Sequence, residues 1–126
     1  MKTYARLRAR LPYPPSTNTA YANVNNRRVK TKAAREYTQA VQAIIIQHPD
    51  WVPLHLAANK TATFTVEIIA HPPDNRRRDL ANLEKIPMDA IFTLLDADDS
   101  QVTHINMIKE QPRAPGHILI TIEANP

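Results

Sequence analysis

Aspartates in two short stretches of the chain are the residues best suited to chemistry. Asp79 stands between a predicted strand and a predicted helix, and Asp96, Asp98 and Asp99 follow the predicted end of that helix. Carboxylate clusters bind hard cations such as Mg²⁺ through oxygen. One or two such ions can generate hydroxide and stabilise both oxygens of an in-line phosphoryl displacement. The structural alternative is that Asp79 caps a helix and the other acids form a solvated turn.

Lys85 fits the same chemistry. It lies one helical turn beyond position 81, so the two positions share a helix face. An ammonium there would orient a scissile phosphate or neutralise the charge that develops in the transition state. The structural alternative is a salt bridge to Asp89, four residues further on.

Two basic runs accompany the acids. They contain Arg76, Arg77 and Arg78 in the first, and Arg27, Arg28, Lys30, Lys32 and Arg35 in the second. Such runs are often only solvated faces, but guanidinium groups beside an acidic, metal-dependent site would hold a phosphate backbone next to it. Aromatic residues of the kind that stack single-stranded bases are not interleaved with them, which favours duplex or junction DNA.

Composition excludes several other kinds of site. The chain has no cysteine, which removes thiol nucleophiles, disulfides and thiolate metal sites. Its one glycine, Gly116, is too few for a phosphate-binding loop, a dinucleotide fingerprint or a nucleophile elbow, so we expect no nucleotide cofactor. The five histidines are scattered without metal-ligand spacing. The net charge of +4 is compatible with a polyanionic partner and equally with ordinary solubility.

Length and hydropathy indicate one soluble domain over residues 1–126. Hydrophobic residues make up 43% and charged residues 22% of the chain, the proportions of a globular protein. No apolar run approaches the ~18 residues that a membrane span needs, and the N-terminus lacks the apolar segment of a secretory signal. We therefore expect a cytoplasmic protein without a membrane partner.

The elements that must position these residues suggest an α+β fold, a single small domain with a mixed β-sheet and two helices in the approximate order β(β)αβαββ. The predicted strands cover a short N-terminal segment, residues 20–24 or 27–30, and residues 61–71, 101–109 and 117–123. A helix with Thr31 as N-cap is predicted over residues 31–48, and residues 48–60 are predicted to form a proline-broken loop.

The second helix is predicted to run from near Asp79 to about Leu95, with Pro87 kinking it. If the helix were unbroken, its ends would lie about 24 Å apart at ~1.5 Å per residue. Asp79 and the acids beyond Leu95 can therefore meet only if the chain turns back. The kink at Pro87 and the turn LDADDS would allow that.

Four short motifs resemble the RusA family of Holliday-junction resolvases, small endonucleases common in bacteria and prophages. The family pattern runs R-D-L-D-N-L-x-K, then D-A-L, then D-D-x-Q-[IV]. The corresponding segments of this chain are RDLANLEK at 78–85, DAI at 89–91 and DDSQV at 98–102, and PPSTN at 14–18 matches an N-terminal element. Several linked motifs at these spacings, spread over nearly the whole chain, form a specific signal.

The resemblance implies a homodimer that binds four-way DNA junctions and nicks two opposing strands, one per subunit, with Mg²⁺ (or Mn²⁺) held by aspartates. Carried over by position, Asp79 and Asp99 are metal-binding catalytic acids with Asp98 beside them, and Lys85 is the catalytic lysine. The basic residues at 27–32 and 76–78 would bind the junction arms.

Ala81 departs from this pattern, because the family has its second aspartate there. A methyl group can neither bind Mg²⁺ nor accept a proton, so metal binding and turnover should both fall. Either the aspartate was replaced by design or a natural member has lost activity; because the other motif positions hold, we favour design. Two further alternatives are a non-catalytic DNA- or RNA-binding module that kept the fold, and a metal-dependent phosphohydrolase with other substrates.

Overall fold

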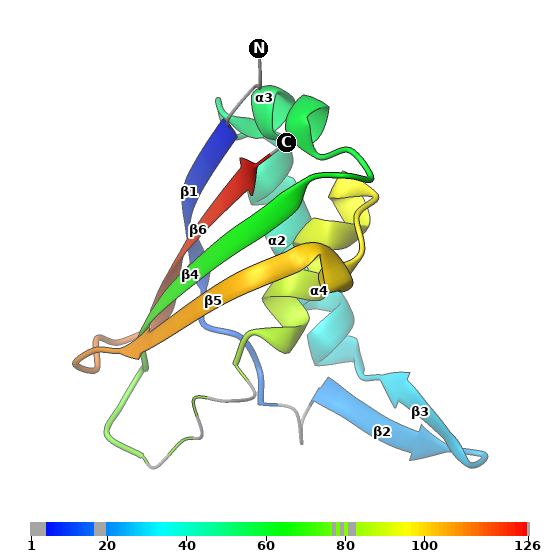
Figure 1. The fold of residues 1–126 in the computed structure, drawn as a ribbon. Helices are drawn as coiled ribbons and strands as arrows, with labels where there is room; N and C mark the ends of the chain where they lie inside the picture. Colours follow the sequence, from blue (N-terminus) through cyan, green and yellow to red (C-terminus); the bar gives the residue numbers. More distant parts are fainter. Residues whose placement is uncertain (1–4, 17–19, 77, 79, 81–82, 126) are drawn as a thin grey trace.

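A four-stranded mixed sheet forms the centre of the molecule (Figure 1). The computed structural model describes residues 5–16, 20–76, 78, 80 and 83–125. The strand order is β1 (Ala5–Pro12), β6 (His117–Asn125), β4 (Thr63–His71) and β5 (Val102–Lys109). The β1–β6 and β6–β4 pairs are antiparallel and the β4–β5 pair is parallel, which confirms the predicted α+β class with a mixed sheet.

Alternation of apolar residues along β1, β4 and β6 explains why one face of the sheet is buried. In β1, Leu7 and Leu11 are fully buried, whereas the arginines between and beside them are exposed. The same period of two buries alternate residues of β4 and β6, including Phe64, Ile68 and Ile120. Helices α2 (Lys32–Ile46) and α4 (Lys85–Leu95) cover this face, and the opposite face of the sheet carries no helix among the described residues (Figure 1).

Helix α2 confirms the first predicted helix. The Thr31 hydroxyl accepts a hydrogen bond of 3.3 Å from the Ala34 backbone N–H, as expected for an N-cap. The apolar stripe of the helix, including Tyr37, Val41 and Ile45, packs into the core. The Tyr37 hydroxyl donates a 2.7 Å hydrogen bond to the carbonyl of Pro12, which fixes the end of β1 against the helix.

The predicted loop over residues 48–60 is wrong, because its centre forms helix α3 (Trp51–Ala57). Pro53 lies in the first turn of this helix, where backbone N–H groups have no intrahelical partner and a proline is tolerated. Leu54 and Ala57 anchor the short helix to the core. The described part of the chain therefore has three α-helices where two were predicted.

Helix α4 also differs from its prediction. It begins at Lys85 with Glu84 in the N-cap position, six residues later than the predicted start at Asp79, which lies outside the described residues. Pro87 consequently falls in the first turn, and the helix continues through it without the predicted interruption. Asp96, with a φ of 53°, ends the helix.

A two-stranded hairpin forms from both segments that were predicted as alternatives. Strand β2 (Tyr21–Val24) pairs with β3 (Arg27–Lys30), and Asn25 and Asn26 form the turn with φ of 52° and 62°. Two successive positive φ values are typical of a type I′ turn, which asparagine tolerates. The hairpin and the loop after β4 both lie at the end of the molecule opposite α3 (Figure 1).

Candidate functional site

An open acidic pocket of about 510 Å³ lies at the C-terminal end of α4. Four carboxylates line it, from Asp89, Asp96, Asp98 and Asp99, together with Phe92, Thr93 and Ala97. The pocket forms because positions 89, 92–93 and 96 recur on one face of α4, and the turn after the helix brings the next acids to the same place. Asp98 and Asp99 are predicted site residues, and Asp96 was named with them in the predicted carboxylate cluster. Asp89 was considered as a salt-bridge partner of Lys85 and as part of the D-A-L motif, but not as a member of that cluster.

The carboxyls of Asp98 and Asp99 influence each other. Asp98 caps the 3₁₀ turn η2 (Asp99–Gln101), and its Oδ1 accepts a 3.0 Å hydrogen bond from the Ser100 N–H. This backbone hydrogen bond lowers the pKa of Asp98 below its ordinary value. The neighbouring carboxyl of Asp98 raises the pKa of Asp99. A cation placed between such carboxyls would relieve their repulsion and favour the ionised form of both.

Gln101 holds the acidic turn in place. Its side-chain N–H₂ donates to the carbonyls of Asn59 and Ala62, at 2.9 and 3.0 Å, while its Oε1 accepts from the Asp98 N–H at 3.0 Å. One side chain thus ties the acids to the loop that precedes β4. The glutamine of the D-D-x-Q motif therefore has a structural role here, which sequence reasoning did not assign.

Lys85 is the first residue of α4 and is exposed. Its Nζ lies 5.2 Å from the centroid of the Tyr21 ring, and the Arg28 guanidinium carbon lies 4.4 Å from the same centroid. Within the described part of the chain Lys85 forms no ion pair with Asp89, the structural alternative considered for it. Burial raises the pKa of Tyr21, and Asp89 adds to that rise. Tyr21 was missed because an isolated tyrosine gives no sequence signal.

Lys85 and the acidic turn lie at opposite ends of α4. Eleven residues of continuous helix separate them, which is about 16 Å along the axis. Helix α4 does not turn back at Pro87, so the predicted kink is wrong, and the predicted approach of Asp79 to the acids beyond Leu95 stays a prediction. The position of Asp79 relative to either group lies outside the described residues, as do Ala81 and Arg77.

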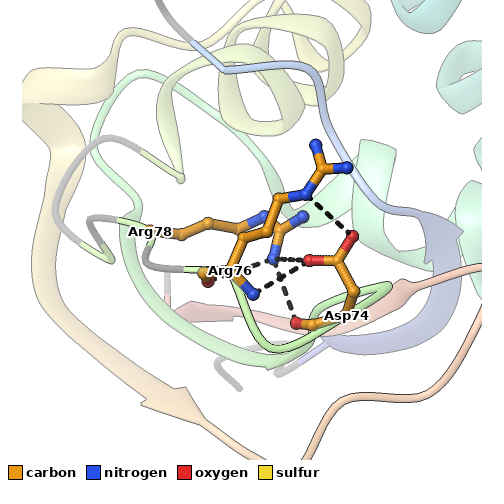
Figure 2. Close-up of polar contacts among 3 residues, drawn as sticks. All are labelled: Asp74, Arg76 and Arg78. Atoms are coloured by element: carbon orange, nitrogen blue, oxygen red, sulfur yellow. Dashed lines mark hydrogen bonds and ion pairs between the residues drawn. The ribbon is translucent and has the colours of Figure 1, made fainter.

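Asp74 organises the described arginines of the first basic run (Figure 2). Its Oδ1 lies 2.8 Å from Nη1 of Arg78, and its Oδ2 lies 3.6 Å from Nε of Arg76. The hydrogen bond from Arg78 is the main cause that lowers the pKa of Asp74. The Arg78 guanidinium also lies 5.8 Å from the centroid of the Tyr13 ring. The loop therefore presents its charge in a fixed arrangement, partly neutralised by an acid that sequence reasoning did not single out.

The second basic run lies mostly on the β2–β3 hairpin. Arg27 and Arg28 are exposed on β3, and Lys30 ends that strand. Lys32 instead starts α2, where its Nζ lies 3.7 Å from a carboxylate oxygen of Glu36. Arg35 donates to the carbonyl of Lys30 at 2.7 Å. The run is thus divided between a projecting hairpin and the first turns of a helix.

The donors available for a metal ion are carboxylate oxygens, which suit Mg²⁺. Among the described residues, however, no three metal-ligating side chains converge closely enough to form a complete site. Asp98 and Asp99 provide two of the predicted ligands, and the third, Asp79, lies outside the described part. Glu84 is a further acid of this region: its Oε2 is buried and accepts no hydrogen bond from a described residue.

Comparison with known proteins finds a family that spans both the acidic pocket and the hairpin. The model of the family Endodeoxyribonuclease RusA matches residues 12–123. The chain belongs to the RusA family. This single match includes the acidic turn, Lys85, Asp74 and the whole hairpin. All of the short RusA motifs therefore lie within one aligned region of the chain.

Individual RusA relatives cover most of the chain. A crossover junction endodeoxyribonuclease RusA from Escherichia coli (strain K12) is 32% identical over 126 residues, covering 97% of this chain and 95% of the relative. The corresponding protein of Enterobacteria phage HK97 is 34% identical over 100 residues, covering 79% and 78% of the two chains. That of Enterobacteria phage 82 is 33% identical over 116 residues, covering 89% of each. No helix within the described RusA fold is long and apolar enough to cross a membrane.

Proposed function

We propose that this RusA-family chain is an endodeoxyribonuclease that binds four-way DNA junctions as a homodimer and hydrolyses a phosphodiester bond in each of two opposing strands. The observation that carries the proposal is the pocket lined by four aspartates, in a chain whose basic loops would hold a phosphate backbone. Two symmetrical nicks require two active sites, which a homodimer would supply. As a DNA-acting protein it would work in the cytoplasm.

Asp98 and Asp99, together with Asp79, would hold Mg²⁺ or Mn²⁺. When bound, the ion would activate water and neutralise charge on the phosphate. Lys85 would orient the scissile phosphate, and its charge would stabilise the transition state. The basic residues of the hairpin and of the 76–78 loop would bind the junction arms and position them without reading their sequence.

Ala81 limits the activity of this chain. A carboxylate lost from a shared metal site weakens metal binding, so we propose that the chain binds junctions but cleaves them weakly or not at all. The loss also removes a negative charge that would repel DNA, and binding should therefore persist. Whether the alanine arose by design or by natural loss, the expected chemistry is the same.

A non-catalytic nucleic-acid-binding module is the second candidate function. The observation that favours it is the alanine at position 81, where the family pattern has a metal-binding aspartate. A phosphohydrolase with other substrates is the third, and it would show turnover on small phosphodiesters without any preference for junctions.

The deciding experiment compares the unsubstituted chain with Ala81→Asp on a labelled four-way junction and on a linear duplex of the same arm sequence, with and without Mg²⁺. We expect both proteins to bind the junction more tightly than the duplex, and Ala81→Asp alone to make paired nicks at a high rate. Ala81→Asp combined with Lys85→Ala is the matched control, which should bind without cutting. Binding by both without cleavage by either would establish the binding module instead.

Residual cleavage by the unsubstituted chain would need its own explanation. Glu84 is the acid to test, because its buried Oε2 accepts no hydrogen bond from a described residue. If Glu84→Gln abolishes residual cleavage while junction binding is unchanged, Glu84 supplies part of the missing negative charge. If cleavage persists, the remaining aspartates suffice.

A further inference from the structure

Four basic or titratable side chains gather at one end of the open face of the sheet, away from the acidic pocket. Arg10 comes from β1, His71 from the end of β4, His117 from the start of β6, and Arg113 from the turn between β5 and β6. We call these four residues the sheet-end cluster. They are distant in sequence, and none of them belongs to either basic run.

The strand register brings the cluster together. His71 and His117 are paired on neighbouring antiparallel strands, and their rings stack with centroids 4.7 Å apart. Pro12 is paired with His117, so Arg10, two residues earlier on the same face, is its diagonal neighbour. The His71 ring is fixed from the other side by a 2.9 Å hydrogen bond between Nδ1 and the carbonyl of Gln111.

The turn that carries Arg113 is held tightly against the end of β4. The Arg113 N–H donates to the carbonyl of Pro72 at 2.8 Å, and the Gly116 N–H donates to the Arg113 carbonyl at 2.6 Å. Gly116 has a φ of +93°, and a Cβ on it would lie 2.9 Å from Pro73. The turn therefore requires glycine at this position. The hydrogen bond to Pro72 holds the Arg113 backbone next to His71, the residue before Pro72.

The two arginines of the cluster form no ion pair within the described part of the chain, unlike Arg6, Arg76 and Arg78. Arg6, on the same strand and face as Arg10, pairs with Glu123 at 3.6 Å. Within the described part of the chain, neither Arg10 nor Arg113 forms an ion pair, and both are exposed. Burial lowers the pKa of His117, and Arg10, His71 and Arg113 lower it further, as expected in a positive local field.

The cluster adjoins a surface already assigned to DNA. The chain passes from His71 directly into the loop in which Asp74 fixes Arg76 and Arg78. This loop continues towards the start of α4, and the hairpin lies at the same end of the molecule (Figure 1). Exposed positive charge thus extends from the loop containing Arg76 and Arg78 onto the open face of the sheet. Arg8, two residues before Arg10 on the same face of β1, is also exposed.

We propose that the sheet-end cluster is a phosphate-binding site for the backbone of a DNA arm, with Arg10 and Arg113 as its charged contacts and the stacked histidines as the support between them. The proposal rests on the proposed function and extends its DNA-binding surface beyond the two basic runs. Such contacts would fix the direction of an arm as it leaves the loop, without reading its sequence.

The experiment measures the affinity of the full chain for a labelled four-way junction over a range of salt concentrations. Each phosphate contact contributes about 0.9 to the slope of log K against log salt on duplex DNA. We expect Arg10→Ala with Arg113→Ala to lower the slope by about 1.8 for each subunit of the bound dimer and to weaken binding at low salt. Arg6→Ala is the matched control, because it removes an arginine from the same strand and face that already has a partner.

A conservative variant protects the result against misfolding. Arg10→Lys with Arg113→Lys keeps both charges, and its salt slope should return close to that of the unsubstituted chain. A salt slope of the alanine double variant equal to that of Arg6→Ala would overturn the proposal. Failure of the unsubstituted chain to prefer the junction over linear duplex would instead contradict the proposed function, so the two failures are distinguishable.

Discussion

The ring of Tyr21 lies under the ammonium of Lys85, with 5.2 Å between Nζ and the ring centroid. Arg28 contacts the same ring, its guanidinium carbon 4.4 Å from the centroid. One aromatic side chain at the base of the hairpin therefore links a predicted DNA-binding residue to the predicted catalytic lysine. A strand of DNA held by Arg28 would lie within reach of Lys85.

Replacing Tyr21 should affect cleavage through the position of Lys85. A cation–π contact at an exposed site stabilises by about 0.5–1 kcal/mol, so Tyr21→Leu in the Ala81→Asp background should lower the cleavage rate roughly two- to five-fold. Tyr21→Phe keeps the ring and should retain the rate. Single-turnover cleavage of a junction at saturating protein measures this. Equal rates for the leucine and phenylalanine variants would show that the ring does not position the lysine.

Gln101 should affect the acidic pocket without contacting a metal ion itself. Gln101→Ala removes three hydrogen bonds that fix the turn containing Asp98 and Asp99, so we expect a loss of about 1–3 kcal/mol of unfolding free energy and weaker Mg²⁺ binding. Denaturant unfolding and titration calorimetry with Mg²⁺ measure the two effects. Gln39→Ala, which changes an exposed glutamine of α2, is the control. An unchanged Mg²⁺ affinity of Gln101→Ala would show that the turn held by Gln101 does not contribute to metal binding.

His117 should make folding stability depend on pH. Burial is the main cause that lowers its pKa in the folded protein, so the unfolded chain binds this proton more readily than the folded one. Its contribution to stability is therefore fully present above the unfolded pKa of about 6.5 and is lost as pH falls below that value. His117→Gln should flatten the unfolding free energy measured by denaturant between pH 5 and 7.5.

The matched control for this pH dependence is His104→Gln, because His104 is exposed on the edge strand β5. It should leave the pH dependence of stability unchanged. Identical pH profiles for His117→Gln and the unsubstituted chain would show that protonation of His117 does not oppose folding. If both variants lost the pH dependence of stability, that dependence would not be specific to His117.

Local patterns in the sequence predicted most of the elements. The period of two in TFTVEIIAH and the spacing of three and four from Ala34 to Ile45 follow from which side chains must be buried, and both gave the correct element type. Thr31 was identified as a cap because a hydroxyl before an apolar helix satisfies a free N–H group. The motifs from Arg78 to Val102 also indicated the family that the comparisons show.

Proline was the main source of error in the predicted elements. Pro53 and Pro87 were taken as breaks, yet each lies in the first turn of a helix, where its missing N–H has no intrahelical acceptor. A proline disrupts a helix interior but not its start, and the sequence around these two residues does not reveal where the helix starts. Packing contributes to that choice, since Leu54 and Ile86, each next to one of these prolines, are buried in the core.

The sequence by itself determined the chemistry of this protein: oxygen ligands, a lysine, abundant arginine, and no thiol or glycine-rich site. Only the tertiary structure decided which of these residues are neighbours. A continuous α4 separates Lys85 from the acidic turn, whereas strand register joins His71 to His117 and places Arg10 beside them. The reason is physical: residue types fix what a side chain can bind, but contacts between distant segments depend on how the strands and helices bury their apolar faces against one another.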